Sequence, residues 1–186
     1  IFSARIDLLA NLSLPAVPDD APMVGIPRAM WAWQQQPFWR TLLASLGLRT
    51  ALSDETNKSI INAGQNAIVS EPCFPILVAH GHVAALLDSG CDHILMPNII
   101  SMETPWTHTE SHLCPWHQTL PYVARRSPQL APGRGKFLSP TIEFRHGPAA
   151  VGKQLAAELL ALPLAKQLGW TKRQITRATA DGYAAQ

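Results

Sequence analysis

The sequence predicts an α/β fold, because short apolar segments typical of buried strands alternate with longer segments typical of helices. The expected strands are residues 23–27, 48–52, 93–96 and 137–139. Pro97 is expected to end the third strand, and Pro140 to end the fourth, which is expected to be the last. The expected helices lie around residues 29–46, 57–63, 76–87, 115–126, 151–162 and after Thr171. Ser53 and Asp54 are expected to cap the helix at 57–63, and Thr171 is expected to cap the last helix. Such alternation favours parallel strands joined by helical crossovers. We therefore expect a three-layer, Rossmann-like α/β domain with a mainly parallel sheet and C-terminal helices.

Composition fits one folded domain and excludes several classes of protein. The chain has 186 residues, of which 47% are hydrophobic and 15% are charged. Disorder is excluded because it requires low hydrophobicity and high net charge. A formal net charge of +2 is too small to indicate a nucleic-acid-binding surface. No apolar run approaches the ~18 residues of a membrane span. From the charge and the apolar runs together, neither nucleic acid nor a membrane is an expected partner.

The beginning of the chain differs from the rest. Residues 1–21 contain prolines beside acidic residues and show no steady periodicity, which predicts a linker or helix from an upstream domain. Residues 22–186 are expected to form a single α/β domain. Because Ile1 opens the chain and no signal-peptide pattern follows, we expect a fragment of a longer multidomain protein.

The cysteine count indicates the redox environment. Cys73, Cys91 and Cys114 are three in number, which excludes a complete intramolecular disulfide framework. A reducing, cytoplasmic location is therefore expected. Cys91 follows Gly90 and opens a predicted strand, so it is expected to be a core residue.

Cys73 and Cys114 share a local pattern. Each is followed within two residues by a proline suited to the first turn of a helix, in the runs Cys73-Phe74-Pro75 and Cys114-Pro115. Each thiol is then expected at a helix N-terminus, near unpaired N–H groups and the positive end of the helix dipole. That environment favours the thiolate, which binds metals or attacks as a nucleophile. An iron–sulfur cluster, zinc and nucleophilic catalysis all remain open, as does the simpler interpretation of two small buried residues.

Two histidines interrupt a helix that is otherwise apolar nearly all round. His80 and His82 lie about 200° apart on a helix, so they cannot bind one metal together. Hydrogen-bonded structural histidines are the simpler interpretation, with Gly81 allowing a neighbouring element to approach closely. A zinc site using Cys73 is the alternative. Three further histidines around Cys114 could supply a ligand: His108, His112 and His117.

Basic residues surround the loop at 127–135: Arg125, Arg126, Arg134 and Lys136. They could hold the phosphates of a nucleotide or of coenzyme A. Since no glycine-rich phosphate-binding loop accompanies them, a solvated basic loop is the preferred interpretation.

Several short motifs form a recognisable set: Gly25-Ile26-Pro27-Arg28, Glu71-Pro72-Cys73-Phe74-Pro75, Ala79-His80-Gly81-His82, and Cys114-Pro115 with Gln118. In this order and spacing, they resemble a domain of unknown function found in CoA-substrate-specific enzyme activases. The resemblance covers most of residues 23–186, and its Cys-Phe-Pro and His-Gly-His runs are the most specific parts.

This resemblance implies a role in electron transfer. Long members of the family join an ATP-binding activator module to parts resembling 2-hydroxyacyl-CoA dehydratase subunits, and these modules are the implied partners. The activator uses ATP hydrolysis to drive an electron onto an iron–sulfur partner. By resemblance, Cys73 and Cys114 are candidate ligands of a [4Fe-4S] cluster. The side chains expected beside these ligands, where they would tune its potential, are Glu71, His80, His82 and Gln118.

Two other functions remain open at this point. One is a non-catalytic interaction module that positions neighbouring domains, and the other is a zinc-binding α/β domain. In each case the isolated domain is not expected to be an active enzyme.

Overall fold

The computed structural model describes residues 8–9, 11–106 and 108–186. The linker or helix expected within residues 1–21 lies partly outside the described residues. Residues 11–22 have turns and irregular backbone and lead into the first strand. Within the described residues, no helix has the length and apolar character needed to cross a bilayer.

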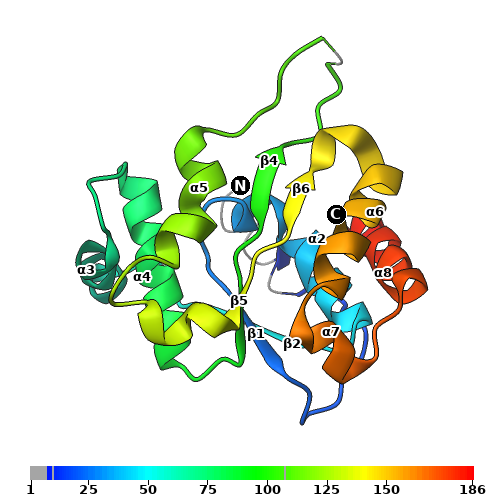
Figure 1. Cartoon of the computed structure of the whole chain (residues 1–186), viewed down its shortest axis with the longest axis horizontal. Helices are drawn as coiled ribbons and strands as arrows, with labels where there is room; N and C mark the ends of the chain where they lie inside the picture. Colours follow the sequence, from blue (N-terminus) through cyan, green and yellow to red (C-terminus); the bar gives the residue numbers. More distant parts are fainter. Residues whose placement is uncertain (1–7, 10, 107) are drawn as a thin grey trace.

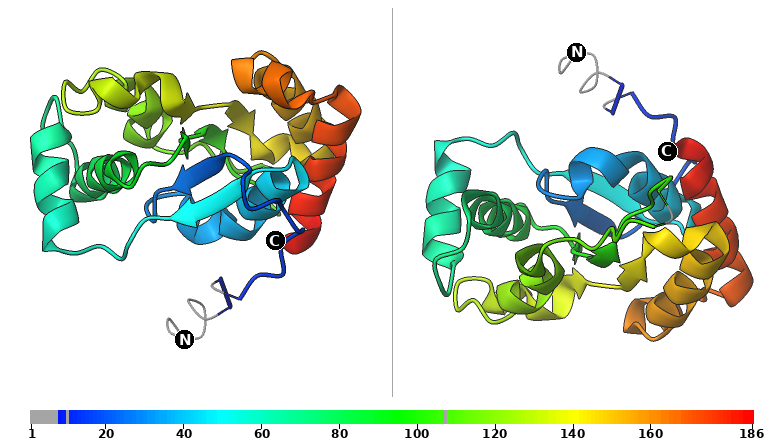
Figure 2. Two further views of the ribbon diagram at one scale, coloured as in Figure 1. Left: turned by 90° about the horizontal axis from the view of Figure 1, so that it is seen from below. Right: turned by 90° about the horizontal axis from the view of Figure 1, so that it is seen from above.

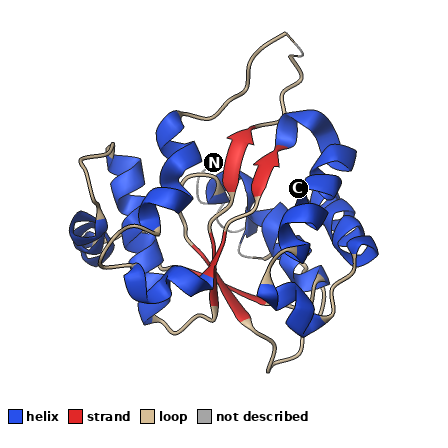
Figure 3. Cartoon of the chain, viewed as in Figure 1, coloured by secondary structure: helices blue, strands red, loops and turns tan. Residues whose placement is uncertain are grey.

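A four-stranded parallel sheet forms the centre of the molecule (Figure 3). Its strands are β1 (Met23–Ile26), β2 (Arg49–Leu52), β3 (His93–Leu95) and β5 (Phe137–Leu138). They lie in the order β2-β1-β3-β5, and every neighbouring pair is parallel. The α/β class, the parallel sheet and the positions of all four expected strands are confirmed.

A second parallel sheet was not expected from the sequence. β4 (Asn98–Ser101) pairs with β6 (Thr141–Glu143). Each of these strands directly follows a proline, Pro97 or Pro140, at which a strand was expected to end. The prediction that residues 137–139 form the last strand is therefore wrong. Proline interrupts a hydrogen-bond ladder without preventing an extended backbone, so the chain leaves one sheet and enters another.

Helices cover both faces of the main sheet. They are α2 (Ala32–Ser45), α3 (Lys58–Ala67), α4 (Phe74–Asp88), α5 (Pro115–Ala124), α6 (Gly147–Leu160), α7 (Pro163–Leu168) and α8 (Lys172–Ala185). Figure 2 shows α4 and α5 on one side, with α3 outside α4, and α2, α6 and α8 on the other. The three-layer arrangement and the C-terminal helices are confirmed.

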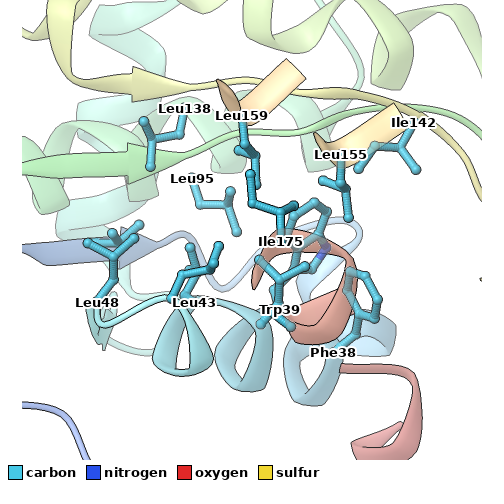
Figure 4. Close-up of a cluster of buried hydrophobic side chains, with 14 of the residues drawn as sticks. Phe38, Trp39, Leu43, Leu48, Leu95, Leu138, Ile142, Leu155, Leu159 and Ile175 are labelled. Carbon is cyan, nitrogen blue, oxygen red and sulfur yellow. The ribbon is translucent and has the colours of Figure 1, made fainter. Parts of the chain in front are cut away.

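The core has two parts, one on each side of the sheet. Successive strand side chains point to opposite faces, so Leu95 packs with α2, α6 and α8 while Ile94 packs with α4 and α5. Figure 4 shows the larger part, where Phe38 and Trp39 of α2 meet Leu155 of α6. This packing fixes α2, α6 and α8 against one face of the sheet.

The start of α3 differs from the prediction. Ser53 and Asp54 were expected to cap a helix at residues 57–63, but the N-cap is Asn57, whose side chain accepts a hydrogen bond from the Ile60 N–H at 3.1 Å. The Ser53 hydroxyl is instead buried and bonded to His82. The Ser53 hydroxyl, which the local sequence pattern assigned to a helix cap, is therefore bonded to a residue distant in sequence instead.

Candidate functional site

Cys73 and Cys114 occupy equivalent positions on two helices. Cys73 is the N-cap of α4 and Cys114 is the N-cap of α5, both in extended backbone, with Pro75 and Pro115 in the first turns. Both cysteines are exposed, and neither side chain caps its helix by a hydrogen bond. The helix-start positions are confirmed, and the interpretation of two buried small residues is wrong. Cys91 is buried, as predicted.

The two cysteines lie at the same end of the molecule. α4 and α5 contact each other, and in Figure 1 both begin at the upper end, toward which the strands run. Crossover helices return antiparallel to the strands, so their first turns lie at the carboxyl edge of the sheet. That edge is where open α/β sheets bind ligands.

His82 is held in a buried network of hydroxyl groups. Its Nδ1 lies 2.8 Å from the Ser53 Oγ, and its Nε2 lies 3.0 Å from the Thr56 Oγ1. The Ser53 Oγ also accepts a hydrogen bond from the Arg28 backbone N–H at 2.9 Å. Burial, helped by the positive charge of Arg28, lowers the pKa of His82 to about 4. His82 is therefore a neutral, hydrogen-bonded structural histidine, as the sequence predicted.

His80 and Gly81 lie inside the helical layer. The His80 Nδ1 donates to the Ile76 carbonyl at 2.8 Å, and burial lowers the pKa of His80. Its buried Nε2 has no hydrogen-bond partner among the described residues. A Cβ at Gly81 would overlap the backbone carbonyl of Ile60 on α3. The predicted close approach of a neighbouring element at Gly81 is thus confirmed.

The other residues predicted beside the cysteines have different environments. Glu71 is exposed two residues before Cys73. The Gln118 side-chain amide donates to the Leu113 carbonyl at 2.6 Å, which holds the backbone immediately before Cys114. In the described part of the chain, no three His, Cys, Asp or Glu side chains are grouped closely enough to hold a metal ion. A complete set of metal ligands is therefore not formed by these residues.

Comparison with protein families identifies what kind of domain this is. The family described as CoA enzyme activase uncharacterised domain (DUF2229) matches residues 23–186. The chain belongs to this family. The match begins at the first residue of β1 and includes Cys73 and Cys114, so the resemblance seen in the sequence is confirmed. Comparison with curated proteins and with solved structures gives no match.

Within this family domain, the basic cluster lies away from Cys114. Three of its four members, Arg125, Arg126 and Arg134, line a pocket of about 280 Å³ with Tyr122. Lys136 instead donates to the Cys91 carbonyl at 2.8 Å. Arg125 and Arg126 directly follow the C-terminus of α5, where positive charge complements the helix dipole. Arg126 and Arg134 are exposed, as a solvated basic loop requires, whereas Arg125 is half-buried and donates to the Phe137 carbonyl at 3.1 Å.

Two parts of the site were missed in the sequence. The first is the pairing of Ser53 and Thr56 with His82, and the second is a pocket containing Met30 and His117. The available signal was position: Ser53 follows β2 directly and Met30 follows β1 after a short loop. Residues just beyond the carboxyl ends of parallel strands are brought together in this type of sheet.

Proposed function

We propose that this domain contributes cysteine ligands to a [4Fe-4S] cluster in an ATP-dependent electron-transfer system of the 2-hydroxyacyl-CoA dehydratase type. The observation that carries the proposal is the matched placement of Cys73 and Cys114, both exposed at the first turns of helices in contact. Unpaired N–H groups and the positive ends of two helix dipoles stabilise the negative charge of thiolates and of a cluster.

The domain would act together with other domains or chains. A four-iron cluster takes three or four protein ligands, and the described residues offer two exposed thiols. We therefore assign the remaining ligands to a dehydratase-like module, and the supply of electrons to an ATP-binding activator module. A reducing, cytoplasmic compartment suits three free cysteines.

The residues around the cysteines would have separate tasks. Gln118 positions the backbone before Cys114 through its bond to Leu113. Glu71, exposed next to the α4 N-terminus, would place negative charge near the cluster. His82 has both ring nitrogens bonded within the domain, so it would act by fixing α4 rather than by bonding to the cluster. His80 would tune the reduction potential of the cluster from its buried position within α4.

Anaerobic reconstitution tests this proposal. The chain is incubated with iron, sulfide and excess dithiothreitol, whose thiols can complete the coordination. We expect broad visible absorbance and bound iron and sulfide, all lost in Cys73→Ala and in Cys114→Ala. Cys91→Ala is the matched control, because Cys91 is buried and should leave the cluster intact. A colourless wild-type protein, or equal loss in Cys91→Ala, would contradict the proposal.

A non-catalytic interaction module is the second candidate. It is favoured by two exposed aromatic side chains beside the cysteines, Phe74 and Trp116. Elemental analysis of the purified protein separates it from the zinc alternative. Stoichiometric zinc lost in both cysteine variants supports a zinc site, whereas no metal before or after reconstitution supports the interaction module.

A further inference from the structure

A pocket of about 370 Å³ opens beside the first turn of α5. Its lining residues come from the segment after β1, the first turn of α2, the segment between β4 and α5, and α5 itself: Met30, Trp31, Trp33, Gln34, Met102, Leu113 and His117. One of these lining residues, His117, is three positions after Cys114, a proposed cluster ligand.

Sheet topology explains why a pocket forms here. After β1 the chain turns to α2 on one face, whereas after β2 it crosses to β3 through helices on the opposite face. The carboxyl ends of β1 and β3 therefore mark the point where the crossovers change sides. The connections that follow these two strands diverge there and leave a crevice, and ligands of open α/β sheets bind in such crevices.

Gln34 and His117 are the two lining residues with polar amide or imidazole groups, and of these two only His117 is buried. Its side chain is buried, with a residue exposure of 7%. Its Nε2 has no hydrogen-bond partner among the described residues, although a buried polar atom of this kind is normally paired. Burial lowers the pKa of His117 to about 4, so the ring is neutral at pH 7 and offers one donor and one acceptor nitrogen.

The remaining lining is uncharged and largely apolar, which favours flat apolar ligands. No Asp, Glu, Lys or Arg is among the residues that line the pocket. Met30 and Met102 supply thioethers, which contact aromatic rings favourably, and Trp31 and Trp33 supply indoles. Met30 has a φ of 54°, the left-handed region that non-glycine residues rarely adopt. This turn carries the chain from β1 to the wall of the pocket.

We infer that this pocket binds an uncharged aromatic ring bearing one hydrogen-bonding group, which pairs with His117. Its volume exceeds the ~150 Å³ that holds benzene in an engineered cavity. A ring substituent would take the place of the missing partner at Nε2, while the thioethers and indoles surround the ring. The inference concerns a site separate from the thiols, so it stands or falls independently of the cluster.

Two probes differing by one hydroxyl group test the inference on the cluster-free protein. Binding of 4-methylphenol and of toluene is followed by ligand-observed NMR and by the ring shifts of His117. We expect 4-methylphenol to bind with a dissociation constant on the order of 1 mM. His117→Leu should weaken 4-methylphenol about tenfold and leave toluene unchanged. His117→Gln, which keeps a hydrogen-bonding group, should recover part of the loss.

Two further variants make the result decisive. His112→Leu removes an exposed histidine from the preceding loop and should leave both affinities unchanged. Leu113→Trp, at a half-buried lining position, should fill the pocket and weaken both probes. The inference is overturned if neither probe binds, if His117→Leu leaves 4-methylphenol unaffected, or if Leu113→Trp weakens neither probe. Cluster reconstitution reports on Cys73 and Cys114, so failure of either proposal can be recognised separately.

Discussion

Ser53 connects the end of β2 to the middle of α4 through one hydroxyl group. It accepts from the Arg28 N–H and shares a hydrogen bond with His82, and both Ser53 and His82 are buried. A buried polar group costs little while it is bonded and much more once its partner is removed. The hydroxyl therefore matters through the two groups that it satisfies.

Removal of this hydroxyl should destabilise the fold. Ser53→Ala leaves the Arg28 N–H and one ring nitrogen of His82 unpaired, so we expect a loss of about 1–3 kcal/mol in the free energy of unfolding. Urea denaturation at neutral pH measures it. Ser70→Ala, at an exposed serine, is the matched control and should change stability by less than ~0.5 kcal/mol. Equal stability of the two variants would contradict the prediction.

The three cysteines should differ in reactivity. Cys73 and Cys114 are exposed and Cys91 is buried. We expect Ellman's reagent to modify two thiols rapidly in the folded protein and the third only after denaturant is added. Cys73→Ala should leave one rapid thiol, and Cys91→Ala should leave two. Rapid modification of all three wild-type thiols would contradict the prediction, because it requires Cys91 to be accessible in the folded protein.

Among the secondary-structure elements, α3 and α4 illustrate how glycine allows close packing. A Cβ at Gly64 of α3 would overlap the Leu77 carbonyl of α4, and a Cβ at Gly81 would overlap the Ile60 carbonyl of α3. Backbone atoms cannot move aside as a flexible side chain can. The two glycines therefore set the separation of these helices and thereby support the helix that begins at Cys73.

Two helical glycines should respond oppositely to alanine. Gly81→Ala should lower the free energy of unfolding by about 2 kcal/mol or more, because overpacking outweighs the higher helix propensity of alanine. Gly152→Ala in α6 meets its nearest neighbour, a Thr176 methyl, at 3.7 Å, an ordinary contact. It should raise stability by up to ~1 kcal/mol. Denaturant unfolding of both variants is the measurement, and a neutral Gly81→Ala would refute the packing argument.

For the molecule as a whole, buried neutral histidines make stability depend on pH. The pKa of His82 and that of His117 are lowered from 6.5 to about 4, chiefly by burial. In the unfolded chain both rings take up protons below pH ~6.5, which the folded protein resists. Stability is therefore complete above that pH and decreases as the pH falls toward 4. Each histidine contributes up to about 3 kcal/mol to this change.

Urea denaturation at about pH 7.5 and about pH 4.5 tests this dependence. We expect the wild-type protein to lose several kcal/mol at the lower pH, and His117→Leu to lose about 2.5 kcal/mol less. Stability that is flat over this interval would show that the two rings are protonated in the folded state.

The sequence was sufficient for the local features of the fold. The helix starts at Cys73 and Cys114 follow from nearby prolines, and the predicted cap at Thr171 is a complete capping box. The four strands of the main sheet follow from short apolar runs. These features depend on backbone geometry and hydrogen bonds within a few residues, so the local pattern contains the necessary information.

The second sheet, the Ser53–His82 bond and the His117 pocket required the assembled molecule. β4 and β6 pair across 43 positions of sequence, and Ser53 meets His82 across 29. Local preferences were even misleading there, since Ser53 suits a helix cap and Pro97 suits a strand end. Such contacts form because the packed sheet and helices bring distant groups together and bury them, which the pattern of neighbouring residues does not specify.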